Sequence, residues 1–69
     1  MKTLDEFMSE LGWNTTELAR QAGIDYRTAK KAVDGDAISH RAARDIASAI
    51  ARATDENITV GSIRGLVIR

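Results

Sequence analysis

Glycines divide the first half of the chain into three short segments, and each segment has the residue spacing of an amphipathic helix. Gly12, Gly23 and Gly35 stand eleven or twelve residues apart. Glycine readily takes the left-handed backbone conformation that ends many helices. Between the glycines, apolar residues recur three and four positions apart, which is typical of a helix with one buried face. These apolar positions are Leu4, Phe7, Met8 and Leu11, then Leu18, Ala19 and Ala22, then Ala29, Ala32 and Val33.

Polar residues that favour helix starts precede three of the expected helices. Asn14, with Glu17 three residues later, is close to a capping box, and Asp25 and Ser39 are also favoured N-cap residues. The pattern predicts helices that end at Gly12, at Gly23 and at Gly35, the third running from about 26 to 34. A fourth runs from about 40 to 53, with its apolar stripe at Ala43, Ile46, Ala47, Ile50 and Ala53.

Two apolar residues flank the second expected helix. Trp13 precedes the Asn14 cap, and Leu18 stands at the fourth helical position, which matches a hydrophobic staple. We therefore expect Trp13 to belong to the core rather than to stack on a ligand. Ile24, directly after Gly23, is expected to anchor the turn in the core.

The C-terminal stretch has a weaker pattern. Residues 55–57 are expected to form a loop, and Thr59 is a candidate cap for a short turn over 60–64 that Gly65 ends. Residues 66–68 are too few to classify and could be extended. Six apolar residues crowd this C-terminal extension, 58–69: Ile58, Val60, Ile63, Leu66, Val67 and Ile68. They predict either part of a homodimer interface or a segment that folds back onto its own core, and both readings stay open.

Length and composition favour one small helical domain over residues 1–69. The chain has 69 residues, no cysteine and no proline, so disulfides and thiolate metal sites are excluded. Alanine and aliphatic residues dominate the apolar set, whereas a β-sandwich would need more β-branched and aromatic residues. We expect an all-α fold, a compact bundle of four to five helices. No apolar run reaches the length of a membrane span or a signal-peptide core, so we expect a cytoplasmic protein and no membrane partner.

The net charge is zero, but the charges are unevenly distributed. Residues 1–18 hold one lysine against four carboxylates, a net of −3, and residues 19–54 hold seven cations against four carboxylates, a net of +3. Nucleic-acid-binding domains are usually basic, so the total argues mildly against that function. The basic middle can nevertheless form a positive face.

The third expected helix leaves an aromatic and three cations outside its apolar stripe. Tyr26, Arg27, Lys30 and Lys31 point away from the alanines. Two helices joined at Gly23 by a tight turn, the second short and basic, describe a helix-turn-helix. The major groove of DNA admits a whole helix and offers hydrogen-bonding groups to such side chains. We interpret the third helix as a recognition helix, against the alternative of an ordinary solvated surface.

The stretch "NTTELARQAGIDYRTAKKAVDG" resembles the helix-turn-helix family of phage repressors, Cro proteins and xenobiotic-response-element type transcriptional regulators. The matching features are Leu18-Ala19, Ala22-Gly23-Ile24, Asp25, Thr28 and Gly35, and Ile46-Ala47 with Ile50 is similar to the family's fourth helix. The resemblance implies a lambda-repressor-like fold with the motif at about 15–34. Val33 replaces a glutamate that many relatives have, and Ala29 and Ala32 are smaller than usual, which indicates tighter helix packing.

The same resemblance implies which residues would touch double-stranded DNA. Base contacts would come from the first two turns of the recognition helix. Phosphate contacts would come from two helix starts, which favour anions. The base contacts are Tyr26, Arg27, Lys30 and Lys31, and the phosphate contacts are Asn14, Thr15, Thr16, Ser39, His40 and Arg41.

We therefore expect a small sequence-specific DNA-binding regulator or repressor, pairing as a homodimer in solution or only on DNA. Other hypotheses stay open: a protein–protein interaction module on the same fold, an antitoxin that represses its own operon, or a recombination directionality factor. We expect no enzyme, because neighbouring Ser39 and His40 point apart on a helix. With one histidine and no cysteine we expect no metal, and we expect no cofactor and no small-molecule ligand.

Overall fold

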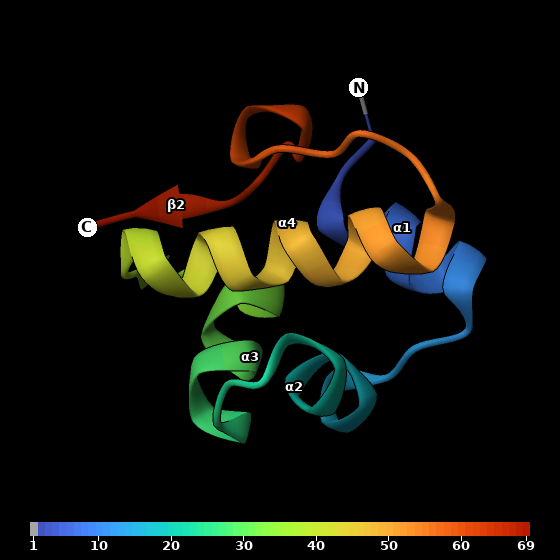
Figure 1. The fold of residues 1–69 in the computed structure, drawn as a ribbon. Helices are drawn as coiled ribbons and strands as arrows, with labels where there is room; N and C mark the ends of the chain where they lie inside the picture. The colour runs from blue at the N-terminus through green and yellow to red at the C-terminus, as the bar shows by residue number, and fades with distance from the viewer. Residues whose placement is uncertain (1) are drawn as a thin grey trace.

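The computed structural model describes residues 2–69 and is mostly helical (Figure 1). Its four α-helices are α1 (Leu4–Leu11), α2 (Thr15–Ala22), α3 (Tyr26–Asp34) and α4 (His40–Thr54). A single 3-10 turn, η1 (Val60–Ser62), and two short strands, β1 (Ala37–Ile38) and β2 (Val67–Ile68), complete the fold. In Figure 1, α4 crosses the middle of the molecule, with α2 and α3 on one side and η1 on the other. The four predicted helices are confirmed, with their bounds within a residue of the prediction.

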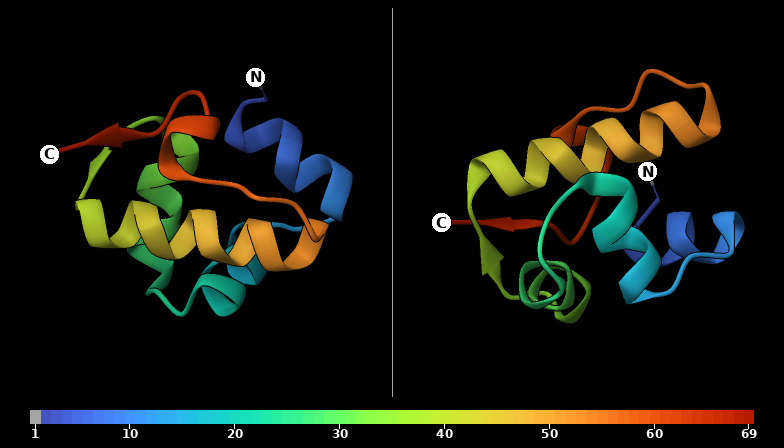
Figure 2. Two further views of the ribbon diagram at one scale, coloured as in Figure 1. Left: turned by 45° about the horizontal axis from the view of Figure 1, so that its top comes forward. Right: turned by 60° about the horizontal axis from the view of Figure 1, so that its bottom comes forward.

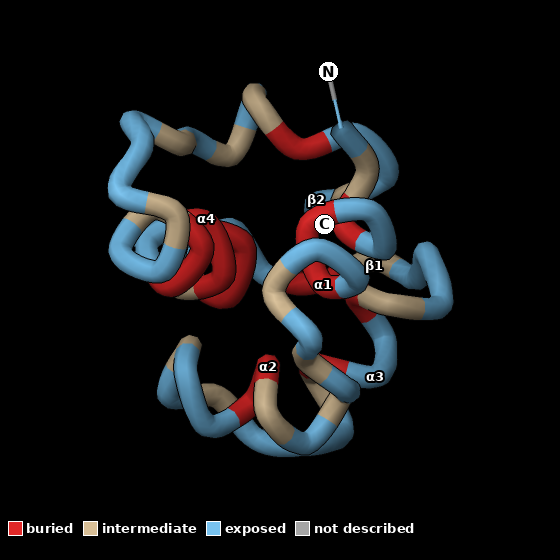
Figure 3. Tube along the Cα trace, turned by 90° about the vertical axis from the view of Figure 1, so that its right-hand side faces the viewer, coloured by how far each residue is buried: buried red, intermediate tan, exposed pale blue. Residues whose placement is uncertain are grey.

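The core forms around α4, whose inner side is buried along most of its length (Figure 3). Ala43, Ile46 and Ile50 are fully buried, as the predicted stripe requires. The stripe is wider than predicted, because Ala42 and Ala49 are buried as well. The prediction that Ala53 belongs to it is wrong: Ala53 is exposed, since no other element covers that side of the last turn.

Hydrogen bonds at the helix starts explain where the helices begin. The side chains of Asn14, Asp25 and Ser39 each accept a bond from the backbone N–H three residues on, as predicted. The capping box predicted at Asn14 is only half formed, because the Glu17 side chain faces Gln21 and Arg20 instead. A complete capping box lies at α1, between Thr3 and Glu6, a signal that the sequence analysis missed.

The C-terminal extension corrects the all-α prediction. The expected fifth helix is only the 3-10 turn η1, and β2 pairs in parallel with β1, Ala37 opposite Val67 and Ile38 opposite Ile68. Figure 2 shows the two strands beside the N-terminal end of α4. Each strand is two residues long, too short for an alternating pattern, and the pairing joins segments about thirty residues apart. Local sequence patterns therefore could not predict this sheet.

The same extension contributes to the domain's own core. Ile63 is buried, and Ile58, Val60 and Leu66 pack against the core while remaining partly exposed. Val67 and Ile68 are exposed, at 46% and 37%. The hypothesis that the C-terminal extension folds back onto its own core is therefore correct for four of its six apolar residues.

Two residues expected in the core are less buried than predicted. Trp13 and Ile24 are half-buried and pack against the core from its edge. Trp13 follows the left-handed Gly12, and its backbone N–H donates to the Met8 carbonyl at 2.9 Å. It therefore lies at the junction of α1 and α2, where its side chain remains partly exposed.

Acid should destabilise the fold through the caps. Hydrogen bonds from Thr28 lower the pKa of Asp25, and hydrogen bonds from Thr3 lower the pKa of Glu6. The folded state favours the ionised form, so this stabilisation is present above the unfolded pKa, about 4, and is lost as pH falls below it. We expect the melting temperature to fall below about pH 4, as followed by circular dichroism.

The variant Asp25→Asn isolates this effect, because asparagine caps a helix but does not titrate. It should lose less stability between pH 5 and pH 3 than the parent does. Asp36→Asn changes an exposed carboxyl that accepts no cap hydrogen bond, so it is the matched control. Equal acid sensitivity of Asp25→Asn and the parent would contradict the role of the Asp25 cap.

Truncation of Trp13 should weaken the domain without removing its core. Trp→Ala at a fully buried site costs about 3–5 kcal/mol, and a half-buried ring should cost about half of that, near 2 kcal/mol. Urea unfolding of Trp13→Ala would measure the loss, and Trp13→Phe, which keeps most of the apolar area, should lose less. A Trp13→Ala variant as stable as the parent would show that the ring does not contribute to packing.

Candidate nucleic-acid interface

The outward face of α3 carries the residues predicted to contact bases. Ala29 and Ala32 are buried against the rest of the domain. With 3.6 residues per turn, Arg27, Lys31 and Asp34 lie opposite them. Tyr26 and Lys30 lie on one flank of this face, and Tyr26 is 54% exposed. The structure thus brings the four predicted base-contact residues together on one exposed surface.

The cations on this face differ in their surroundings. The Lys30 Nζ lies 3.2 Å from the Asp34 Oδ2, one helical turn away. Within residues 2–69, Arg27 and Lys31 form no ion pair with a carboxylate. An exposed pair of this kind is worth little, so Lys30 can exchange Asp34 for another anion at small cost. The face therefore offers two free cations and one that is loosely held.

The start of α2, at Thr15, and the α2–α3 turn lie at opposite ends of this helix. The Asn14 Oδ1 accepts a hydrogen bond from the Glu17 N–H at 2.8 Å. The N–H groups of Thr15 and Thr16, in the same first turn, have no partner within the helix. Thr16 is exposed, and Thr15 is half-buried. These residues form an anion-favouring helix start, and the structure does not place them in a hollow with the other predicted contacts.

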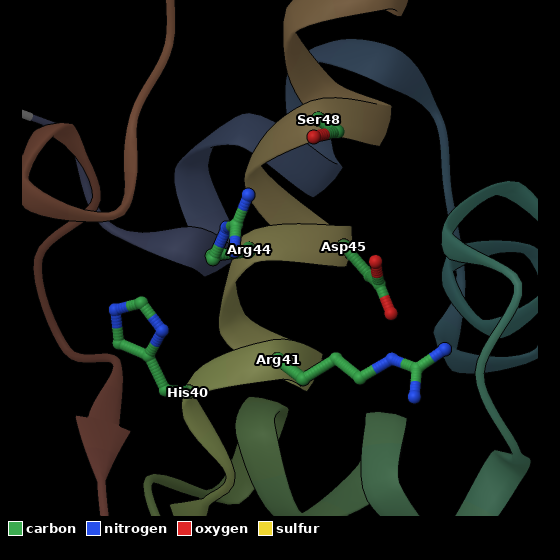
Figure 4. A pocket seen from close by; sticks show the side chains of 5 residues that line it. All are labelled: His40, Arg41, Arg44, Asp45 and Ser48. Atoms are coloured by element: carbon green, nitrogen blue, oxygen red, sulfur yellow. The ribbon is translucent and has the colours of Figure 1, made fainter.

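At the start of α4, the predicted residues separate onto two sides. The Ser39 Oγ accepts the Ala42 N–H at 3.1 Å. Arg41 extends toward α2 and the α2–α3 turn, whereas His40 lies on the side that faces the C-terminal segment (Figure 4). His40 lines a groove of about 360 Å3 with Ile58 and Val60. The structure therefore groups Arg41, and not His40, with the α2–α3 turn.

A hollow of about 270 Å3 joins the turn, the first turn of α3 and the start of α4. Thr28, Ser39 and Arg41 line it, and so does Arg69, which directly follows β2. Sequence reasoning did not select Arg69. No local signal could have found it, since the pairing of β2 with β1 brings this residue to α4.

Two carboxylates also line this hollow, Asp25 and Asp45. Asp25 caps α3, and bonding from the side chain and backbone of Thr28 lowers its pKa, so it is ionised at neutral pH. Asp45 stands four residues after Arg41, but the described residues show no ion pair between them. The hollow therefore holds two cations and two anions that are not locked to one another.

A third surface lies along the solvent side of α4. His40, Arg44 and Ser48 line a shallow hollow of about 390 Å3 there, together with Arg41 and Asp45 (Figure 4). The side chains spread apart rather than converge on one point. Among residues 2–69 no group of three or more His, Asp or Glu side chains could hold a metal ion.

Comparisons with known proteins found no match: no family model, no curated protein and no solved structure is similar to this chain. Among residues 2–69 no helix has both the length and the apolar character needed to cross a membrane. The geometry of the chain itself is therefore the basis for assigning a function.

Proposed function

We propose that this protein is a sequence-specific double-stranded DNA-binding regulator whose α3 enters the major groove. The observation that carries the proposal is the outward face of α3, where Tyr26, Arg27, Lys30 and Lys31 are all exposed on a helix of nine residues. The major groove, about 12 Å wide, accommodates such a helix. Arginine and lysine suit guanine edges, and tyrosine can donate a hydrogen bond to a base or phosphate.

The connection between α2 and α3 supports a helix-turn-helix interpretation of 15–34. Gly23 has a φ of 70°, in the left-handed region, and its N–H donates to carbonyls of the last turn of α2. Two residues later Asp25 caps α3, so three residues, Gly23 to Asp25, connect the two helices. In this class of motif the first helix crosses the backbone while the second reads bases. The packing of α2 against both α3 and α4 would hold the recognition helix in place.

Phosphate contacts are proposed at the starts of α2 and α4. The caps Asn14 and Ser39 each satisfy only the third N–H of their helix, so the first two N–H groups can donate to a phosphate. Such contacts position a protein on DNA without reading sequence. Arg41 lies closer to the α2–α3 turn than His40, and we assign it the larger share of the contact at α4.

A protein–protein interaction module is the second candidate. It is favoured by the zero net charge and by α1, where Asp5, Glu6 and Glu10 make an acidic helix. The salt dependence of binding to bulk DNA separates the two, because phosphate contacts release counterions. An antitoxin or a recombination directionality factor would keep the DNA-binding face and change only the biological role.

We also propose that two copies bind DNA together through β2. One recognition helix covers a half-site, and many such proteins read two half-sites as dimers. β2 pairs with β1 on one side only within the described residues, and Val67 and Ile68 are exposed beside that edge. An exposed strand edge with apolar side chains readily pairs with a second chain. The proposed interface includes fewer apolar residues than the C-terminal extension contains, because Ile63 is buried in the core.

Removing the proposed base contacts should weaken specific binding without unfolding the domain. Arg27→Ala and Lys30→Ala should each cost about 1–3 kcal/mol on a duplex obtained by selection from random sequences, at one fixed salt concentration. The loss should be smaller on an unrelated duplex. Lys2→Ala, which removes a cation from the segment before α1, is the matched control. Unchanged affinity in both α3 variants would reject the assigned face.

The dimer proposal predicts the stoichiometry on DNA. Val67→Lys places a charge at the exposed edge of β2, so it should reduce the two-to-one complex measured by sedimentation and leave the circular dichroism spectrum unchanged. Ser9→Lys, at an exposed position of α1, controls for the added positive charge. One-to-one binding of the parent to a non-palindromic site would contradict pairing altogether.

A further inference from the structure

The hollow between the α2–α3 turn and α4 contains a cation that the proposed contacts leave unused. Arg69 lines it together with Arg41, Thr28 and Ser39. No described carboxylate lies within ion-pair distance of Arg41 or Arg69. Arg69 is also distant in sequence from the other residues of the hollow, so a specific structural arrangement brings it there.

Backbone hydrogen bonding fixes the position of Arg69. Its N–H donates to the Ile38 carbonyl at 2.9 Å, which extends the β1–β2 ladder by one residue. Ile38 is fully buried, and the next residue, Ser39, caps α4. The backbone of Arg69 is therefore held beside the start of α4, while its side chain is exposed. A long flexible side chain anchored there can reach across the hollow.

The donor set suits a phosphodiester. A guanidinium presents five N–H donors in a fixed plane that matches phosphate oxygens, and it keeps its charge when water is displaced. Ser39 adds a hydroxyl group, whereas the Thr28 side chain bonds to Asp25, and the first N–H groups of α4 have no partner within the helix. Arg41, Ser39 and Arg69 thus line one hollow beside the first turn of α3.

The carboxylates of the hollow restrict which anion can bind. Asp25 and Asp45 also line the hollow, so two carboxylates balance the two guanidinium groups. The binding of a free phosphate there would therefore gain little electrostatic energy. A phosphate of a duplex arrives with other contacts already made, on α3 and at the start of α2. Those contacts would offset the repulsion between this phosphate and the carboxylates of Asp25 and Asp45. A free phosphate has no such contacts.

We infer that Arg69 binds a backbone phosphate of the DNA beside the first turn of α3, with Arg41 as its partner. This inference rests on the proposed DNA binding. The contact would not read sequence, because it addresses the backbone and not base edges. It also gives the β1–β2 pair a role, since that pair places a cation from the C-terminal extension at the recognition helix.

The test compares Arg69→Ala and Arg69→Gln with the Lys2→Ala control in the full chain. All three variants remove one positive charge, but Lys2 lies before α1, pairs with Glu10 and does not line this hollow. Dissociation constants would be measured for a selected duplex and an unrelated duplex over a series of salt concentrations. Inorganic phosphate would be titrated separately by calorimetry.

We expect both Arg69 variants to weaken binding on the order of fivefold on both duplexes, and to reduce the slope of log K against log salt by about 0.9, one phosphate contact. Lys2→Ala should leave the slope unchanged, and free phosphate should not bind. Arg69 variants that behave like Lys2→Ala would overturn the inference, and so would a loss confined to the selected duplex. A parent protein that binds neither duplex would instead reject the proposed function, and Arg69 binding with it.

Discussion

The close approach of short helices to α4 is the constraint on which the other features depend. α2 packs against both α3 and α4, and the residues at these contacts are mostly alanine. Ala19 of α2, Ala29 of α3 and Ala43 of α4 are small and buried, while Leu18, Ile46 and Ile50 fill the remaining space. A domain of this size has few apolar residues to bury, so it cannot leave gaps between helices. Tight packing therefore also fixes the orientation of α3.

That packing explains why α3 can present so many long side chains. Its buried stripe is narrow and made of small residues, Ala29 and Ala32, with Val33 at the margin. A helix held by two alanines needs little of its circumference for the core. The remaining circumference is free for Arg27, Lys31 and their neighbours. The narrow buried stripe contributes little to the core, and it leaves most of the surface of α3 available for contact with a partner.

Sequence patterns predicted the helices well because their signals are local. A cap such as Asn14 and a left-handed glycine such as Gly23 act within one turn, so neighbouring residues suffice to locate them. The side on which His40 lies depends on how α4 packs against η1, which no local pattern encodes. Arg69 and the β1–β2 pair depend on contacts between distant segments. The residues predicted on α3 are therefore exposed as expected, whereas those at the start of α4 separate onto two sides.

The charge along α3 changes sign, and this determines which end can approach DNA under the proposed function. Arg27 lies in the first turn and Lys31 in the last turn, where Asp34 ends the helix; Asp5 of α1 shares a hollow of about 240 Å3 with Asp34. Among residues 2–69, Arg64 is the one cation that lines this hollow.

Salt screens the charges at the two ends of α3 from one another only in part, because Lys30 pairs with Asp34. Nine residues of helix span about 13 Å, longer than the Debye length of about 8 Å at physiological salt. Asp34 offsets the charge of Lys30, with which it pairs, whereas Arg27 lies about 10 Å from Asp34 along the helix axis, beyond one Debye length. A net charge of zero is therefore compatible with phosphate binding at the first turn. The same acidic end is repelled by phosphates, so the helix would enter the groove by its N-terminal turns. Arg41 and Arg69 lie beside those turns, where a backbone strand would pass.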